Sequence, residues 1–253
     1  MLVGAHLSKS SLDGDIRETG SEISQIFVSN PRGYQSPNLD VLSMIKSPNP
    51  IYIHLPFLVN PASINTEVRA KSLDLILATD QISDPRLHGI VIHGGQGGKD
   101  STINEAIDRW VKLFNGVKLK NKLLIENTAG GNAAPGKNIA THIELVQKLS
   151  KYNNIGICYD TCHSFASGSD DFLLDLERYS NEFEKVDLIH LNDSKDKCNS
   201  NRDRHELLGA GEIGMDMLKS IVKRAKVEQI NIILETPGNN SLWRDEIKRV
   251  KSL

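Results

Sequence analysis

The residues of this chain best suited to chemistry stand directly behind short apolar runs. Ile51-Tyr52-Ile53 leads into a histidine, and five further runs lead into a histidine or a carboxylate. The residues in these positions are His54, His93, Glu126, Asp160, His190 and Glu235. Imidazole and carboxylate groups are typical ligands of zinc and related metals. One polar residue at a strand end is ordinary, but six in series predict strands whose ends converge on a metal site.

Two further segments offer the same ligand types. Asp160 and His163 stand three residues apart on one turn, and Asp203 and His205 stand two apart, on one side of an extended segment. With the strand ends they make nine donors, enough for two or three metals if one carboxylate bridges. Clusters of this kind suit in-line displacement at phosphorus, because one metal activates water while the others stabilise the developing charge.

Each residue taken alone has a simpler interpretation. A single histidine at a strand end is more often hydrogen-bonded in the core than bound to a metal. Asp203-Arg204-His205 alone favours a solvated loop. The whole set argues otherwise, because so many buried polar groups at one point are costly without a cation to neutralise them. Cys158 and Cys162 are expected to pack as small buried residues.

The periodicity predicts the elements that position these groups. Strand-like runs alternate with amphipathic, helix-like stretches. The expected strands are 2–6, 24–29, 51–54, 89–93, 122–126, 156–160, 187–190 and 231–235. The expected helices are 62–79, 101–115, 138–152, 171–179, 214–224 and 241–251. This α/β pattern predicts a TIM (β/α)8 barrel. A doubly wound sheet is the alternative, although no strand–GxGxxG–helix unit is present.

No linker or low-complexity tract divides the chain, so a single domain is expected over residues 1–253. The long connections follow the strands, on the face of a barrel where active sites lie. They are residues 29–37, 55–61, 94–100, 127–137, 161–170 and 192–214.

Composition says more about where the protein is expected to work than about any reaction it catalyses. No apolar run approaches the ~18 residues that a membrane span needs, and no signal peptide is recognisable. Three cysteines without a CxxC pair fit a reducing compartment, so we expect a cytoplasmic protein, and we expect a monomer. The net charge of −2 does not indicate bulk attraction to nucleic acid, so any polyanion must meet local positive charge.

Several segments occur in a characteristic order. They are Gly4–Ser8, His93–Gly95, Glu126–Gly130, Cys158–His163, His190–Lys195, Asp203–His205 and Leu234–Pro237. Together they resemble the endonuclease IV family of apurinic/apyrimidinic endonucleases, from residue 2 to about residue 238. The segments that run to His163, Lys195 and His205 make the resemblance specific.

The resemblance implies a barrel with three zinc ions per chain that cleaves double-stranded DNA 5′ to an abasic site and leaves a 3′-hydroxyl. One zinc is assigned to His54, His93 and Glu126. The second shares Glu126 and takes Asp160, His190 and Glu235. The third is assigned to His163, Asp203 and His205. Glu126 and Glu235 are the implied catalytic residues, with Glu235 orienting or deprotonating the attacking water.

The resemblance also implies contacts with DNA. Arg32 matches an arginine that the family inserts into the duplex. Phe57 and Leu58 stand where an aromatic hydroxyl and an apolar residue usually enter the base stack. Phe57 can still stack but has no hydroxyl, and Tyr34 replaces a usual tryptophan. His6 also ends a strand, but it is expected to support the site rather than bind metal.

Basic residues on the strand-end loops are candidates for phosphate contacts, with ordinary surface ion pairs as the alternative. They are Arg32, Lys99, Lys137, Lys195, Lys197, Arg202 and Arg204.

Two other functions remain open. Metal-dependent sugar isomerases and epimerases share the barrel and a metal site at the strand ends, with fewer ligands and usually without a pair like Asp203 and His205. A catalytically silent DNA- or metal-binding barrel is the third possibility, which the complete set of nine donors disfavours.

Overall fold

Short apolar strands pair in parallel and close into a barrel. In the computed structural model, which describes residues 1–253, the order around the barrel is β1-β10-β7-β6-β5-β4-β3-β2. The bounds are β1 Val3–His6, β2 Ser24–Ile26, β3 Ile51–His54, β4 Leu87–His93, β5 Leu123–Glu126, β6 Ile155–Asp160, β7 Leu188–His190 and β10 Asn231–Leu234. The predicted TIM barrel is confirmed.

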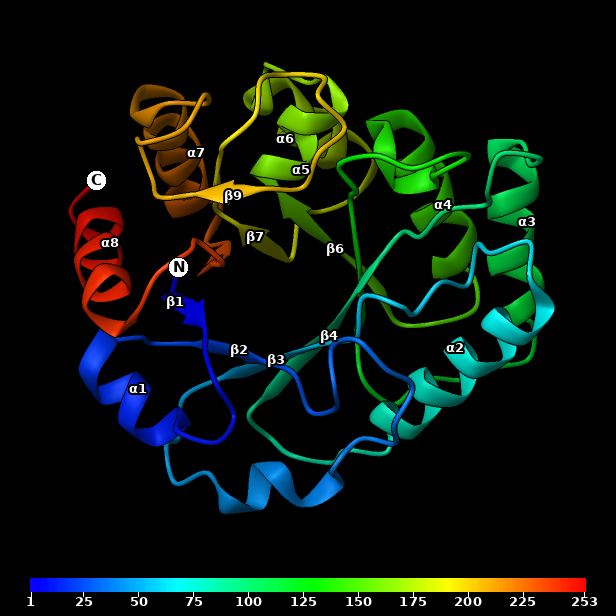
Figure 1. The fold of residues 1–253 in the computed structure, drawn as a ribbon, viewed down its shortest axis with the longest axis horizontal. Coiled ribbons are helices and arrows are strands. Elements are labelled where there is room, and N and C mark those ends of the chain that lie inside the picture. The colour runs from blue at the N-terminus through cyan, green and yellow to red at the C-terminus, as the bar shows by residue number, and fades with distance from the viewer.

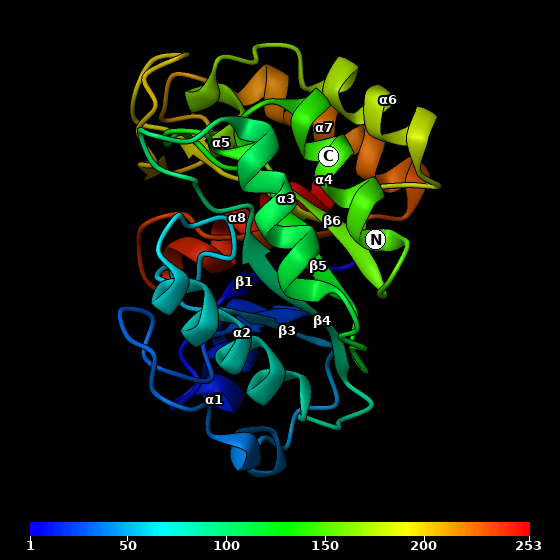
Figure 2. The same cartoon turned by 90° about the vertical axis from the view of Figure 1, so that its right-hand side faces the viewer.

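Helices surround the barrel, as Figures 1 and 2 show. They are α1 Leu12–Thr19, α2 Thr66–Asp80, α3 Ile103–Phe114, α4 Ile139–Ser150, α6 Phe172–Glu182, α7 Met215–Glu228 and α8 Asn240–Ser252. The segment after β2 forms only a 3-10 helix, η1 Leu39–Met44. Prolines at 31, 37, 48 and 50 restrict a longer helix there. A second 3-10 helix, η2 Pro135–Lys137, precedes α4.

Two local elements differ from the sequence prediction. The expected loop 161–170 begins instead as α5 Thr161–Ser167, because the Asp160 carboxylate accepts a hydrogen bond from the His163 backbone N–H at 2.7 Å and caps the helix. The expected loop 192–214 contains a small antiparallel sheet of β8 Asp193–Ser194 and β9 His205–Glu206.

Alternation along the strands sorts side chains into two layers. The outward residues join the large core under the helices, where Trp110 of α3 donates to the Gly94 carbonyl at 3.0 Å. The inward residues form a smaller apolar cluster of Ile23, Tyr52, Val91, Leu124, Cys158, Leu188 and Ile233. Each member stands two residues before a polar one, so the polar residues form the next layer toward the carboxyl ends of the strands.

The cysteines form no disulfide, and Cys158 and Cys162 are buried as predicted. None of the helices has the length and apolar character needed to cross a membrane.

The close approach of β1 and β2 generates a stability prediction. A Cβ on Gly4 would lie 1.8 Å from the carbonyl oxygen of Ile23, whereas a Cβ on Gly14 in α1 would meet nothing within 4 Å. Gly4→Ala is therefore expected to lower the free energy of unfolding by at least ~1–3 kcal/mol. Gly14→Ala is expected to raise it by up to ~1 kcal/mol. Urea unfolding measures both, and equal effects of the two variants would contradict the close contact.

Candidate metal centre

All nine predicted donors meet at the carboxyl ends of the barrel strands. They fall into overlapping groups of three or four whose ligand atoms lie within 4.8 Å of one another. In these groups His163 and His205 accompany Asp160, and Asp203 accompanies His205 and Cys162. Neighbouring strands bring them together, since the parallel register places His93 beside Glu126 and Asp160 beside His190. The nine come from five barrel strands, from the residue after β10, from α5, and from the segment after β7 that includes β9.

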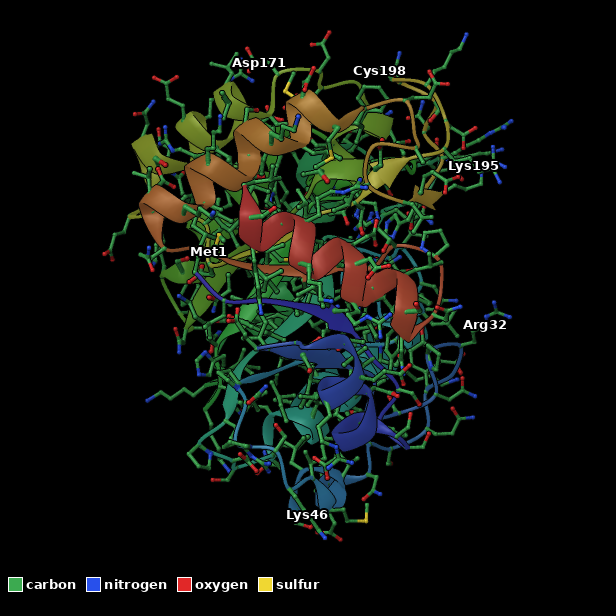
Figure 3. All side chains as sticks on the ribbon, turned by 90° about the vertical axis from the view of Figure 1, so that its left-hand side faces the viewer. Met1, Arg32, Lys46, Asp171, Lys195 and Cys198 are labelled. Carbon is green, nitrogen blue, oxygen red and sulfur yellow. The ribbon has the colours of Figure 1, made fainter.

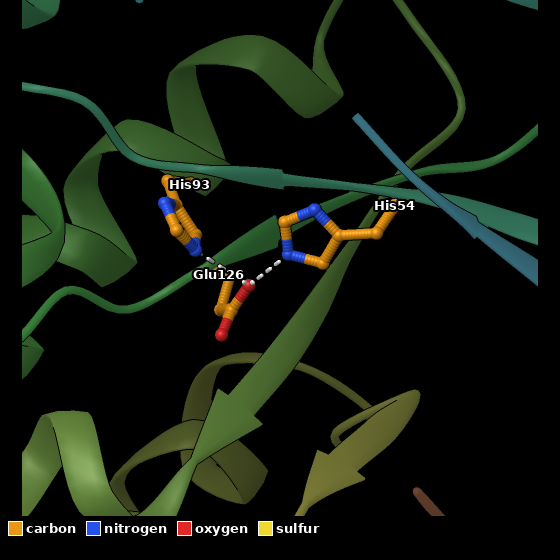
Figure 4. A group of neighbouring side chains, drawn as sticks. All are labelled: His54, His93 and Glu126. Carbon is orange, nitrogen blue, oxygen red and sulfur yellow. Dashed lines mark hydrogen bonds and ion pairs between the residues drawn. The ribbon is translucent and has the colours of Figure 1, made fainter. Parts of the chain in front are cut away.

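The first group joins three adjacent strands. His54 Nε2 and His93 Nε2 lie 3.1 and 3.3 Å from Oε2 of Glu126, and Figure 4 shows both rings directed at this carboxylate. His54 Nδ1 donates to the Leu55 carbonyl at 2.6 Å. That bond leaves the Nε2 lone pair directed at the site, as a metal ligand requires.

The second group uses the other oxygen of the same carboxylate. His190 Nδ1 lies 3.1 Å from Oε1 of Glu126 and 3.2 Å from Oε2 of Glu235. It also lies 3.9 Å from Oδ2 of Asp160. Glu126 is fully buried and turns one oxygen toward each group. This is the arrangement of a bridging carboxylate.

The third group forms around Asp203. Its Oδ1 lies 3.2 Å from His163 Nε2 and 3.1 Å from His205 Nε2. Both imidazoles donate through Nδ1 to a backbone carbonyl, His163 to Asn127 at 2.9 Å and His205 to Glu235 at 3.1 Å. Their Nε2 atoms are thereby turned toward one carboxylate.

The donors fit divalent metal ions by their own chemistry. His205 Nε2 is buried and has no hydrogen-bond partner of good geometry, and a buried polar atom without a partner is costly unless something binds it. Oxygen and nitrogen donors in groups of three or four match zinc. Cys158 and Cys162 lie close to these groups, but burial raises the pKa of each thiol to about 12, which disfavours a thiolate ligand.

Loop 195–204 holds Asp203 in place through long-range backbone contacts. Asn199 N–H donates to the Phe165 carbonyl at 3.0 Å, and Asn201 N–H donates to the Ala166 carbonyl at 2.8 Å. Asn201 also lies so close to Gly130 that a Cβ there would be 3.0 Å from its carbonyl oxygen. The short sheet β8–β9 then brings His205 to the site.

Two asparagines that the sequence reasoning missed hold the second group. Asn192 donates to Oδ2 of Asp160 at 2.7 Å and accepts from the Glu235 backbone N–H at 2.9 Å. Asn127 exchanges hydrogen bonds with both backbone groups of Asp160, at 2.7 and 2.9 Å. Their positions, directly behind Glu126 and two residues after His190, carried a signal. Polar amides beside ligands commonly orient them.

The charges of the cluster depend on one another. Burial opposes charge on Glu126, but His190 and His93 together hold the pKa of this carboxyl well below its usual range. Burial also opposes charge on Glu235, and His190 is again the main group that keeps its pKa well below that range. The site therefore holds ionised carboxylates in a buried position and requires positive charge beside them.

Raised pKa values at three of the imidazoles favour that charge. Burial alone would lower the pKa of His205, but Asp160 and Asp203 raise it to about 9. The pKa values of His163 and His190 are likewise held well above the usual range despite burial, with neighbouring carboxylates among the causes. For His93 burial dominates and lowers the pKa to about 4.

A cavity of about 460 Å³ opens in front of the cluster. Its apolar wall is formed by Phe27, Phe57, Pro237 and Trp243. A second hollow, of about 300 Å³, shares His93, His163 and Phe57 with the first and is lined by the amides of Asn60, Gln96 and Asn201. Two hollows therefore reach the cluster, and Phe57 borders both.

Of the predicted DNA-contact residues, Phe57 lines this cavity, and Leu58 and Arg32 lie on the segments next to it. Phe57 and Leu58 are 54% and 44% exposed, unusually high for large apolar side chains. Arg32 is exposed on the neighbouring loop. This loop contacts the Phe57 segment, because the Phe57 backbone N–H donates a hydrogen bond to the Pro31 carbonyl at 3.1 Å. Figure 3 shows Arg32 projecting from the same side of the molecule as Lys195, with Met1 on the other side.

The basic residues of the strand-end loops divide into two kinds. Arg204 pairs with Asp196, and Arg202 lies 3.7 Å from the same carboxylate. For these two the alternative of a surface ion pair is realised. Lys195 and Lys197, on the same loop, have no acidic partner within 4.0 Å.

Comparison with known proteins agrees with this geometry. A family described as the xylose isomerase-like TIM barrel matches residues 18–253. The 3-keto-D-glucoside 4-epimerase from E. coli has this fold, with a TM-score of 0.71 over all of both chains at 11% identity. Fold and cluster therefore define a barrel of the xylose isomerase-like class with a candidate metal centre at the strand ends.

Two relatives narrow the class. Endonuclease IV from Thermus thermophilus superposes with a TM-score of 0.82 at 26% identity, over 100% of this chain and 98% of that one. The probable endonuclease 4 of Mycobacterium ulcerans is 34% identical over 239 residues, 93% of each chain. The chain belongs to the endonuclease IV family.

The raised histidine pKa values predict that metal binding releases protons. Despite burial, nearby anionic groups raise the pKa values of His163, His190 and His205, that of His205 to about 9, which favours a second proton on each ring. Zinc added to the metal-free protein at pH 7 is expected to displace these protons, and the number released from His205 should fall as the pH rises through about 9. Calorimetric titration in buffers of different ionisation enthalpy measures the count. Binding without proton release would contradict the charge arrangement.

Proposed function

We propose that this chain is a DNA-repair endonuclease that hydrolyses the phosphodiester 5′ to an abasic site in double-stranded DNA and leaves a 3′-hydroxyl. Membership of the endonuclease IV family supports a nuclease. The observation that carries the finer proposal is the Glu126 carboxylate, which turns one oxygen to each of two donor groups, with a third group beside them.

The proposed centre holds three zinc ions. His54, His93 and Glu126 would bind the first. Glu126, Asp160, His190 and Glu235 would bind the second. His163, Asp203 and His205 would bind the third. Zinc ions held by these residues would supply Lewis acidity toward a phosphate and would lower the pKa of water.

The side chains around the centre have distinct tasks in this proposal. Glu235 stays ionised and is 14% exposed at the cavity, so it can orient a water molecule or accept its proton. His6 Nδ1 lies 3.0 Å from its Oε1 and fixes the carboxylate from behind. Glu126 holds two donor groups in register without reaching solvent.

The rim supplies the contact with DNA. Phe57 and Leu58 present apolar surface beside the cluster, as residues that wedge between bases do. Arg32 stands on the adjoining loop, and Lys195 and Lys197 can meet phosphates on the same side. A lesion that lacks a base is already partly unstacked, which lowers the cost of placing its sugar-phosphate in the cavity.

Sugar epimerisation is the weaker candidate. The epimerase likeness, at 11% identity, concerns the fold alone. A single metal site needs no third donor group, yet this chain brings Asp203 and His205 to the cluster with a dedicated sheet and loop. Metal analysis separates the two functions, because about three zinc per chain is expected for the endonuclease and one or two Mn²⁺ or Mg²⁺ for an isomerase.

Cleavage of a defined duplex tests the proposed function. The protein loaded with zinc is expected to nick a duplex with one tetrahydrofuran abasic analogue on the 5′ side of the lesion. Glu235→Gln should reduce the rate by ~10²–10⁴-fold, since it removes an ionised carboxylate that handles the water, while most DNA binding persists. Denaturing gels and a binding titration give the two readouts.

The matched control is Glu182→Gln, the same change at an exposed position of α6. It should leave both rate and affinity unchanged. No nick by the metal-loaded wild type would refute the proposed function. Loss of binding in parallel with cleavage in Glu235→Gln would refute the role given to Glu235.

The two rim loops are joined by a bond that can be removed on its own. Tyr34 donates its hydroxyl to the Leu58 carbonyl at 2.5 Å, which ties the Arg32 loop to the apolar rim. Tyr34→Phe loses one hydrogen bond, about 1 kcal/mol, and is expected to raise KM for the abasic duplex several-fold with kcat nearly unchanged. Steady-state kinetics measures both constants. A fall in kcat alone would show that the bond serves the chemistry rather than the rim.

A further inference from the structure

One buried amide touches the cluster without belonging to any donor group. Gln25 lies in the middle of β2, is fully buried, and stands two residues after Ile23 in the inward-facing register. It therefore occupies in β2 the position that His54 and Glu126 occupy in their strands. An amide is a poor zinc ligand, so its place in the ring of donors calls for another task.

The oxygen end of this amide meets one proposed ligand. Gln25 Oε1 lies 2.9 Å from His190 Nε2, and a carbonyl oxygen only accepts, so the ring must carry its proton on Nε2. The opposite nitrogen, Nδ1, faces Glu126 and Glu235 and is the atom left without a proton when the ring becomes neutral to bind a metal. The bond thus selects the tautomer that can bind a metal.

The nitrogen end meets another ligand. Gln25 Nε2 donates to Oε1 of Glu235 at 2.7 Å, and His6 Nδ1 lies 3.0 Å from the same oxygen. The second oxygen of Glu235 is left facing His190 Nδ1 at 3.2 Å. The amide cannot be reversed, because its oxygen would then face the Glu235 carboxylate.

We propose that Gln25 is the positioning residue of the second metal site, fixing the His190 tautomer with one end and the free oxygen of Glu235 with the other. The inference rests on the proposed function for the identity of that site. It accounts for a buried polar residue in a strand that contributes no donor. Groups that orient metal ligands in this way typically change metal affinity 10–100-fold.

Gln25→Met tests the proposal, because methionine is similar in length and packs in apolar surroundings but cannot make either hydrogen bond. Ser24→Ala is the matched control on the same strand, where the hydroxyl is buried without a hydrogen-bond partner. Competition with a chromogenic zinc chelator is expected to show one zinc site weakened about 10–100-fold in Gln25→Met. The other sites, and all sites of Ser24→Ala, should retain their affinity.

A second readout does not require metal. In the metal-free protein, nitrogen-edited NMR should detect a slowly exchanging His190 Nε2 proton, assigned by its loss in His190→Gln. The signal should persist in Ser24→Ala and vanish in Gln25→Met. Loss of the signal with an unchanged melting temperature separates positioning from a general loss of structure.

The outcomes divide cleanly between the two proposals. Wild-type zinc affinity and a protected His190 proton in Gln25→Met would overturn the positioning role. A wild type that fails to nick the abasic duplex would refute the proposed function, whereas the NMR comparison would still decide whether Gln25 holds His190.

Discussion

The carboxylate of Glu126 is the interaction on which the rest of the site depends. It is completely buried at the end of β5, yet its pKa is held low, so it carries charge where charge is costly. That cost is offset by the imidazoles that approach both of its oxygens. Imidazoles from β3 and β4 meet one oxygen, and those from β7 and α5 meet the other. The remaining donors are arranged around this single group.

The barrel makes such a group possible through its side-chain alternation. Each inward polar residue has an apolar residue two positions earlier, which closes the barrel below the cluster. Water is therefore excluded from one side, which strengthens every electrostatic interaction above it. The outward residues between them pack under the helices and hold the strand ends at fixed spacing. The geometry of the donors and the packing of the core therefore both follow from the alternation of side chains along each strand, which repeats every two residues.

The same period explains how much the sequence alone could predict. The strand-end donors were predictable because parallel strands bring their ends together, and the apolar runs mark those ends. The start of α5 was not, because Thr161–Ser167 becomes helical through the cap of Asp160, which also reads as a ligand. The β8–β9 sheet and the anchoring of Asn201 depend on contacts with residues more than ten positions away. The two-residue period also places Gln25 on the inner face of the barrel, but the residue was not assigned to the site from the sequence.

The proposed metal centre would also reconcile an acidic chain with the proposed polyanionic substrate. The formal net charge of −2 includes four carboxylates of the cluster, so the rest of the chain carries a net charge of +2. Three zinc ions, as proposed, would add six positive charges and bring the loaded protein to +4. The attraction would then be concentrated beside the scissile phosphate instead of being spread over the surface. Affinity for DNA should accordingly depend on metal loading more strongly than on any one surface lysine.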